Sequence, residues 1–370
     1  MNIKQLINKT TSAAVVVGLL LPVLARAQRP PAEVIQADRR ATRAAIAVQN
    51  RVTPRLMAMP EILGTAVGLD AQDELSLVIF VNSEAKNVGQ VMRDLPTELR
   101  GVKVSVELTE PFRAPIRVAP TDSSGALHRG IQTPPIRLGT SGGWREDLAN
   151  GYCCGGTLGS LVQIGSTKYV LSNYHVLEAD TVDGGNNIVA HARDPVIQPG
   201  LIDLACNESY AQNVATLSGI KSLPSSNVDA AIAEVVSGMV NTDGYILDIG
   251  TISASTVDAF LGQKVKKSGR TTGLTRSSVS GLNATVRVSY ENECAGGAAF
   301  TKTFTGQIII KNRIKGSSFI AGGDSGSLMV EDVDTDPRAV GLLFAGSSTT
   351  AVANPIGQVL SFFKATMVGN

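Results

Sequence analysis

Short apolar segments separated by glycine, asparagine and aspartate fill most of this 370-residue chain. From about residue 144 onward such segments recur at short intervals, for example at 157–164, 169–172, 230–235, 305–310 and 340–345. Short runs bounded by turn-forming residues predict β-strands. Many short strands over roughly 225 residues predict a sandwich or barrel, so we expect this part of the chain to be mainly β.

The region before residue 112 has a different pattern. Helical spacing at 32–59, with Pro54 ending or kinking the helix, is followed by strand patterns at 61–69 and 75–81. A helical pattern at 88–99 and a strand pattern at 102–108 complete an α-β-β-α-β order. This order predicts a small α+β domain over residues 28–112. A proline-rich linker at 113–143 then leads to a β domain at 144–370.

The first 27 residues predict an export signal. Lys4 and Lys9 precede an apolar run at 13–24, and Ala25 and Ala27 stand at the positions that a signal peptidase reads. An uncleaved anchor is the alternative, although the run is short for a membrane span. Removal of residues 1–27 would change the net charge from +1 to about −2, which gives no basic excess for binding nucleic acid. We therefore expect a secreted or periplasmic protein without a membrane partner after processing.

The four cysteines predict two disulfides in an oxidising compartment. Cys153 and Cys154 are adjacent and would point in opposite directions on a strand, so each needs a distant partner. Cys206 and Cys294 are the available partners, and the sequence leaves the pairing open. Zinc binding is the rival interpretation, but no CxxC or CxxxH spacing accompanies these residues.

Ser325 lies in a glycine-rich loop at 322–328, GGDSGSL. It directly follows Asp324 and has glycines on both sides of this pair. Such a loop can present a nucleophile, and the backbone N–H groups of Gly323 and Ser325 can face an oxyanion. His175 ends an apolar strand pattern, and Asp229 opens another. A histidine can take the serine proton while an aspartate orients the imidazole ring, so we predict His175, Asp229 and Ser325 as catalytic residues.

Four segments together resemble the chymotrypsin-like (trypsin superfamily) serine peptidases. They are CCGGTLGSLV at 153–162, LSNYHVL at 171–177, VDAA at 228–231 and GDSGSL at 323–328. Residues 340–347 also resemble the strand that holds the substrate backbone beside the specificity pocket. The resemblance covers roughly residues 144–366 and implies a double six-stranded β-barrel with the active site between the barrels.

SGRTTGL at 268–274 resembles a segment of the bacterial branch, in which an arginine can pair with the acid before the serine. The resemblance therefore suggests that Arg270 pairs with Asp324 and supports the serine loop. The resemblance, aligned by distance from Ser325, implies that the base of the specificity pocket lies near Phe319 and Ile320. Phe344 and Gly346 belong to the substrate-binding strand. No acid occurs at these positions, so cleavage after lysine or arginine is not favoured, and apolar or small side chains are expected. Acidic side chains are the alternative, because Ser347, Ser348 and Thr349 could hydrogen-bond a carboxylate.

These observations predict an exported serine endopeptidase that acts on polypeptides through an acyl-enzyme. Neither a metal nor a cofactor is required. The alternative is a catalytically silent binding protein with a peptidase fold. The N-terminal domain has two interpretations: a removable pro-domain that acts as an intramolecular inhibitor or chaperone, or a permanent docking module.

Overall fold

The computed structural model describes residues 31–370 except 71, 73, 115–125, 150–151, 179–189, 291–299 and 315–316, with no side chains described at 31–38, 126, 149, 152, 313 and 314. The predicted signal at 1–27 lies outside the described residues. Residues 41–370 form one compact unit. Among the described residues, none of the helices combines the length and the apolar character that a membrane crossing requires.

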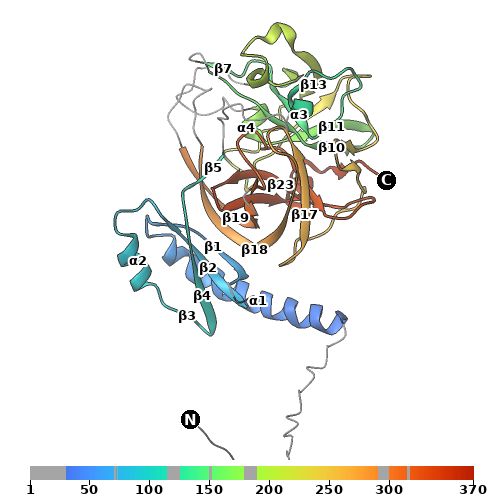
Figure 1. The fold of residues 1–370 in the computed structure, drawn as a ribbon. Helices are drawn as coiled ribbons and strands as arrows, with labels where there is room; N and C mark the ends of the chain where they lie inside the picture. Colours follow the sequence, from blue (N-terminus) through green and yellow to red (C-terminus); the bar gives the residue numbers. More distant parts are fainter. Residues whose placement is uncertain are drawn as a thin grey trace, which may run out of the picture. The chain divides into compact units, whose positions relative to one another are not determined.

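Six strands of the C-terminal region form a closed antiparallel barrel (Figure 1). Their order is β17 (Lys264–Gly269), β22 (Leu328–Glu331), β23 (Ala339–Gly346), β24 (Thr350–Pro355), β19 (Phe300–Lys311) and β18 (Gly273–Tyr290). The ring closes because β17 also pairs with β18, from Lys264 opposite Ser278 to Gly269 opposite Gly273. Helix α5 (Ile356–Phe363) follows β24 and buries Ile356, Val359 and Phe363.

A second antiparallel sheet forms the other barrel. It contains β25 (Thr366–Met367), β10 (Ser160–Ile164), β11 (Thr167–Ser172), β14 (Ala231–Val235), β13 (Gln212–Leu217), β12 (Pro195–Gln198), β6 (Thr140–Trp144) and β9 (Gly156–Leu158). In this order, β10 and β9 stand at opposite ends of a series of seven hydrogen-bonded strands. Only Gly159 separates β9 from β10 along the chain, so this connection brings the two ends of the series together. The predicted fold class, mainly β with a chymotrypsin-like double barrel and an added α+β region, is confirmed.

The smaller elements are helix α3 (Ala126–Arg129), helix α4 (Tyr174–Leu177), the 3₁₀ turns η2 (Leu201–Asp203) and η3 (Glu208–Tyr210), and three two-stranded ribbons. The ribbons are β7 (Leu148–Ala149) with β8 (Tyr152–Cys153), β15 (Tyr245–Ile246) with β16 (Gly250–Thr251), and β20 (Arg313–Ile314) with β21 (Ser317–Ser318).

The N-terminal elements follow the predicted order: α1 (Pro31–Leu56), β1 (Ile62–Leu69), β2 (Leu75–Asn82), α2 (Val88–Asp94), β3 (Glu98–Leu99) and β4 (Val102–Thr109). Pro54 lies within α1 rather than ending it. Helix α2 is shorter than the pattern at 88–99 predicts. Leu95, which precedes Pro96, has an extended backbone, and a residue before proline disfavours the helical conformation.

Strand β1 connects these N-terminal elements to the C-terminal barrel. It pairs antiparallel with β18, with Gly64 opposite Val286, so one sheet runs from the barrel through β1, β2 and β4. A side chain at Gly64 would come within 2.6 Å of the carbonyl oxygen of Thr285, which explains a glycine at this crossing. The two regions also share a core, because Phe80 and Phe112 belong to the same buried cluster as Phe304.

The range predicted as a linker, 113–143, contains ordered structure in its described part. Strand β5 (Phe112–Ala114) pairs with β18 and β23, and β6 begins at Thr140. His128 is 2% exposed and hydrogen-bonds the carbonyl oxygen of Gly139 and the carboxylate of Asp248. The segment from residue 126 is therefore part of the packed fold.

Candidate active site

His175 and Asp229 lie together on the first barrel. His175 is in helix α4, directly after β11, and Asp229 precedes β14, which pairs with β11. The imidazole Nδ1 is 2.6 Å from Asp229 Oδ2, and the backbone N–H of His175 donates to Oδ1 at 3.3 Å. Asp229 is fully buried and His175 is 7% exposed. The aspartate can therefore fix the orientation of the imidazole ring, as the sequence predicts.

Further hydrogen bonds fix the backbone around Asp229. Its N–H donates to Asn354 Oδ1 at 2.9 Å, and its carbonyl oxygen accepts from Asn173 Nδ2 at 2.7 Å. Asn354 in turn donates to Gln307 of the second barrel. The position of the buried carboxylate is thus determined by both barrels, which satisfies the backbone groups that burial would otherwise leave unpaired.

Ser325 lies on a tight loop that precedes β22 of the second barrel. Gly323 and Gly326 have φ angles of +88° and +90°, a region that side chains disfavour, so glycine is required at both positions. The loop contacts β9 of the first barrel, where Thr157 N–H donates to the Ser325 carbonyl oxygen at 2.8 Å. Thr157 Oγ1 also donates to the carbonyl oxygen of Gly323 at 2.9 Å.

Two glycines allow this close approach. A Cβ atom at Gly156 would lie 2.6 Å from Val176 Cγ2 and 2.9 Å from the Ser325 carbonyl oxygen. Gly156 therefore lies between the serine loop and the residue that follows His175. A Cβ atom at Gly159 would clash with the carbonyl oxygen of Gly326. The glycines of the 153–162 segment thus bring the serine loop close to the histidine turn.

The structure does not form a hydrogen bond between Ser325 and His175. His175 Nε2 is buried and has no hydrogen-bond partner among the described residues. Nε2 is the nitrogen that faces away from Asp229, so it is the one that is available to accept a proton. Hydrogen bonds of this kind are often long in unliganded enzymes and shorten when substrate binds.

The two predicted oxyanion donors, the N–H groups of Gly323 and Ser325, point away from the side chains that bond their neighbouring carbonyl groups. The carbonyl oxygen of Gly322 accepts from Thr271 Oγ1, so the N–H of Gly323, in the same planar peptide, points away from Thr271. The carbonyl oxygen of Asp324 accepts from Ser327, so the N–H of Ser325 points away from Ser327. Neither N–H donates to an acceptor among the described residues. Both remain free to bind an oxyanion.

The predicted pairing of Arg270 with Asp324 is wrong. The guanidinium of Arg270 instead contacts both carboxylate oxygens of Asp203, at 2.7 Å from Nε and 2.5 Å from a terminal nitrogen. Arg270 still supports the serine loop indirectly, because it donates to Thr271 Oγ1, which in turn bonds Gly322. The fork of an arginine matches a carboxylate well, and Asp203 presents one from η2.

Asp324 is held by a buried lysine and by backbone amides. Lys267 Nζ lies 3.4 Å from its carboxylate, and both side chains are fully buried. Four donors complete the contacts: the N–H groups of Thr271, Thr272 and Ala321, and the hydroxyl of Thr272. Burial lowers the pKa of Lys267, and the charge of Asp324 opposes that shift. Lys267, three residues before Arg270, was not predicted from the sequence.

The four predicted pocket residues divide into two groups. Ile320 and Gly346 are in contact, because a Cβ atom at Gly346 would lie 2.9 Å from Ile320 Cδ1. Phe319 packs in the same buried cluster as Ile320, whereas Phe344 packs with Phe304 in another cluster. Ile320 therefore limits the space beside Gly346.

Two residues near His175 were not predicted. Tyr290 donates its hydroxyl to Asp229 Oδ2 at 2.8 Å. The alternation of Val286, Val288 and Tyr290 on one face of a strand was a usable signal for burial. Glu178 is fully buried after helix α4, and neither of its carboxylate oxygens has a hydrogen-bond partner among the described residues. Burial raises the pKa of Glu178 to about 8, against a smaller opposing effect of Lys221.

One predicted disulfide is resolved. Cys153 bonds Cys206, with the sulfur atoms 2.06 Å apart. Cys154 is also disulfide-bonded, and Cys294 lies outside the described residues. Over the described part of the chain, no three histidine, cysteine or acidic side chains converge as metal ligands.

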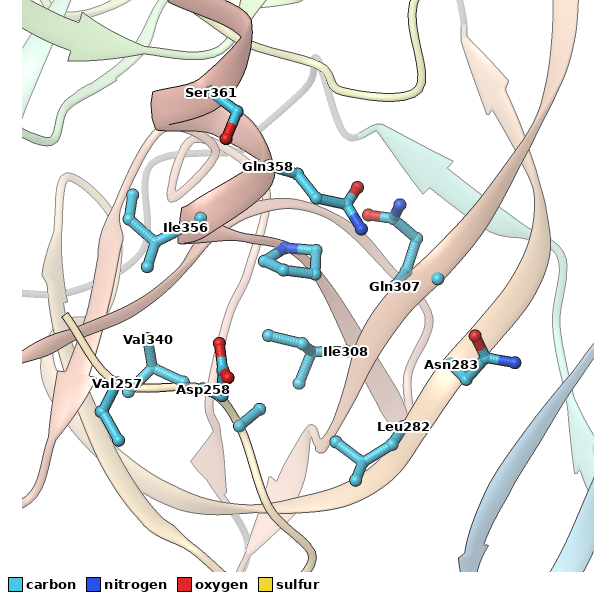
Figure 2. Close-up of a pocket in the computed structure, with 14 residues that line it drawn as sticks. Val257, Asp258, Leu282, Asn283, Gln307, Ile308, Val340, Ile356, Gln358 and Ser361 are labelled. Atoms are coloured by element: carbon cyan, nitrogen blue, oxygen red, sulfur yellow. The ribbon is translucent and has the colours of Figure 1, made fainter. Parts of the chain in front are cut away.

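A cavity of about 630 Å³ lies elsewhere, between α5 and the second barrel. Figure 2 shows Gln358 of α5 and Gln307 and Ile308 of β19 around it. His175, Asp229 and Ser325 do not line this cavity. The candidate active site is therefore separate from this cavity.

A family model described as the Nal1 C-terminal domain matches residues 225–354. The chain has no match among curated proteins. Solved structures with a similar fold include a glutamic acid specific serine protease, which is 19% identical with a TM-score of 0.41 over 63% of this chain and 100% of that one. Protease A of Thermobifida fusca is 20% identical, with a TM-score of 0.41 over 64% and 99% of the two chains. Cellulomonas bogoriensis chymotrypsin is 16% identical, with a TM-score of 0.39 over 64% and 99%.

Proposed function

We propose that the protein is an exported serine endopeptidase that hydrolyses peptide bonds through an acyl-enzyme. The observation that carries this proposal is the convergence of a buried His175–Asp229 pair with a serine loop that has two free amide donors. Ser325 would attack the carbonyl carbon of the scissile peptide bond while His175 Nε2 takes the hydroxyl proton. The tetrahedral oxyanion would accept hydrogen bonds from the N–H groups of Gly323 and Ser325.

The second half of the reaction uses the same groups. The imidazolium would give its proton to the leaving amine, which completes the acyl-enzyme. Water would then attack the ester, with His175 again taking the proton, and release of Ser325 would restore the starting state. Asp229 would stabilise the imidazolium without taking up the proton itself.

A fluorophosphonate probe tests this proposal, because it reacts with an activated serine. We expect labelling of the wild type and none of Ser325→Ala, with His175→Ala reduced by several orders of magnitude. Ser361→Ala, which removes an exposed serine of helix α5 away from the candidate site, is the control and should label as the wild type does. Absence of labelling in folded, processed wild type would contradict the peptidase and favour the silent binding protein.

We also propose that the N-terminal region acts as an intramolecular inhibitor. By its resemblance, strand β23 is the strand along which a substrate backbone would pair. Gly346 of β23 pairs on one edge with Ala351 of β24 and on the other with Arg113 of β5. Arg113 lies on the same edge of β23 as the serine loop. The Gly326 N–H donates to the Leu343 carbonyl oxygen on that edge. We infer that Arg113 occupies a position where a substrate strand would pair with Gly346.

The packing of β5 supports a stable contact. Phe112 is fully buried and Ala114 is 1% exposed, and Phe112 meets Phe80 edge-on at 5.4 Å. The packing of Phe112 and the pairing of β1 with β18 both favour an N-terminal region, at 41–114, that remains part of the folded unit.

A further inference from the structure

Tyr290 contacts the candidate triad from the second barrel. Its hydroxyl donates to Asp229 Oδ2 at 2.8 Å, and the same oxygen lies 2.6 Å from His175 Nδ1. The tyrosine ring also meets the imidazole edge-on, with the ring centroids 5.9 Å apart. One carboxylate oxygen thus serves both the histidine and the tyrosine.

The surrounding side chains restrict the position of the tyrosine ring. It is 2% exposed and stacks on Phe300 of β19, with the centroids 4.7 Å apart and the planes 8° from parallel. On the other edge of β18, Tyr290 pairs with Ala114 of β5. A ring held by a strand on each side loses little further freedom when its hydroxyl makes a hydrogen bond.

The electrostatic setting makes the hydroxyl a permanent donor. Burial and the neighbouring charge of Asp229 raise the pKa of Tyr290 well above its ordinary value, so the phenol stays protonated. A further charged group near Asp229 is Lys302 of β19, whose ammonium group lies over the Phe304 ring. The charge of Asp229 opposes the lowering of the Lys302 pKa by burial. Besides His175, Tyr290 is the only side chain in the described structure that donates to this carboxylate.

We propose that Tyr290 is a positioning residue that fixes the Asp229 carboxylate and withdraws part of its negative charge from the imidazole. This inference rests on the proposed peptidase function, because it concerns how His175 is tuned for that reaction. A buried carboxylate needs donors, and a hydrogen bond to a charged group is stronger than one between neutral groups. The hydroxyl therefore orients the carboxylate and moderates its hold on the imidazole proton.

The variant Tyr290→Phe removes only the hydroxyl and keeps the ring that stacks on Phe300. We expect kcat to fall roughly tenfold, with KM nearly unchanged, because the Asp229 carboxylate loses the donor that fixes its orientation towards His175. Tyr169→Phe, which removes a hydroxyl from strand β11, should behave as wild type. Phe300→Leu keeps the hydroxyl and tests the stacking alone; it should cost less activity than Tyr290→Phe.

The pH profile separates this role from a merely structural one. Without the tyrosine donor, the carboxylate carries more negative charge towards the imidazole and stabilises its protonated form. The acid limb of kcat/KM should therefore move to higher pH. A profile that keeps its midpoint while kcat falls would overturn the positioning role, since packing damage alone lowers the rate without moving the limb.

A spectroscopic measurement keeps the inference testable if peptide hydrolysis is undetectable. The Nδ1 proton of His175 should give a strongly shifted NMR resonance, and the chain has only three histidines, so variants of His128 and His191 assign it. The resonance should move in Tyr290→Phe and stay in Tyr169→Phe. Failure of the wild type to label with fluorophosphonate would refute the proposed function. An unmoved resonance in Tyr290→Phe would refute this inference separately.

Discussion

At the scale of single residues, the buried carboxyl group of Glu178 makes the stability of the protein depend on pH. Its pKa rises from 4.5 to about 8 on folding, because burial disfavours the charged form. The folded state therefore binds the proton more tightly than the unfolded state. The contribution of Glu178 to stability is complete below pH 4.5 and is lost as the pH rises towards 8.

We therefore expect Glu178→Gln to stabilise the protein at pH 8 by a few kcal/mol and to change little at pH 4.5. Urea unfolding at both pH values, in a Ser325→Ala background that prevents self-digestion, measures the difference. Glu234→Gln, an exposed glutamate on β14, is the control and should have no such effect. An equal effect of Glu178→Gln at the two pH values would show that the carboxyl group is not neutral in the folded protein.

The residues that the sequence indicated and those that it missed differ in a physical way. His175, Asp229 and Ser325 each stand in a local pattern that can be recognised in the sequence. His175 follows an apolar strand, Asp229 precedes one, and Ser325 lies in a glycine-rich loop. Lys267 looks like an ordinary strand lysine in KVKKSG, yet it is fully buried, because only tertiary pairing brings Asp324 to it. The choice between Lys267 and Arg270 as the partner of Asp324 depends on Asp203, a residue that no local pattern connects to Arg270.

At the scale of elements, the bend between β9 and β10 sets the distance between the two barrels at the active site. Gly159 donates its N–H to the Leu171 carbonyl oxygen at 2.9 Å, which holds the bend against β11. We expect Gly159→Ala to push the Gly326 carbonyl oxygen away, to reduce fluorophosphonate labelling by more than tenfold and to cost about 1–3 kcal/mol of stability.

Gly357→Ala in helix α5 is the matched control for this glycine. A Cβ atom at that position meets no other atom within 4 Å, so the change should be neutral or stabilise the helix by about 0.5–1 kcal/mol. If Gly159→Ala labels as fast as the wild type, the bend does not determine the position of the serine loop.

Element boundaries were predictable where the pattern was local. The strands at 61–69, 75–81 and 102–108 were located to within a residue, because each is a short run rich in strand-forming residues beside a clear turn. The start of the β domain, which was predicted at residue 144, was located too late. Thr140–Trp144 has the composition of a glycine-rich loop, and it becomes a buried strand only by pairing with β9 and β12. Such pairings lie outside any single segment of sequence.

At the scale of the whole molecule, the pairing of β5 with β23 predicts a latent enzyme. Arg113→Pro removes the backbone N–H of residue 113 and should loosen the strand at Gly346. If β5 inhibits by occupying this edge, kcat/KM for peptides should rise several-fold, because the substrate no longer competes with a tethered strand.

Arg113→Ala keeps the backbone groups and should change the rate far less. A fall in activity for Arg113→Pro, with the fold intact by circular dichroism, would contradict inhibition. That result would instead show that β5 completes the active site as a permanent part of it, which is the other interpretation of the N-terminal region.

Strand β18 belongs to the barrel and also pairs with β1, and this double role has a consequence for how the chain is made. More than two hundred residues separate Gly64 of β1 from its partner Val286. During synthesis from the N-terminus, β1 and β2 therefore emerge long before the strand that covers their edge. Contacts between such distant segments form slowly, and an uncovered strand edge can pair with other chains in the meantime. Correct folding of this protein thus requires that the edge of β1 stays unpaired until β18, in the last third of the chain, has been synthesised.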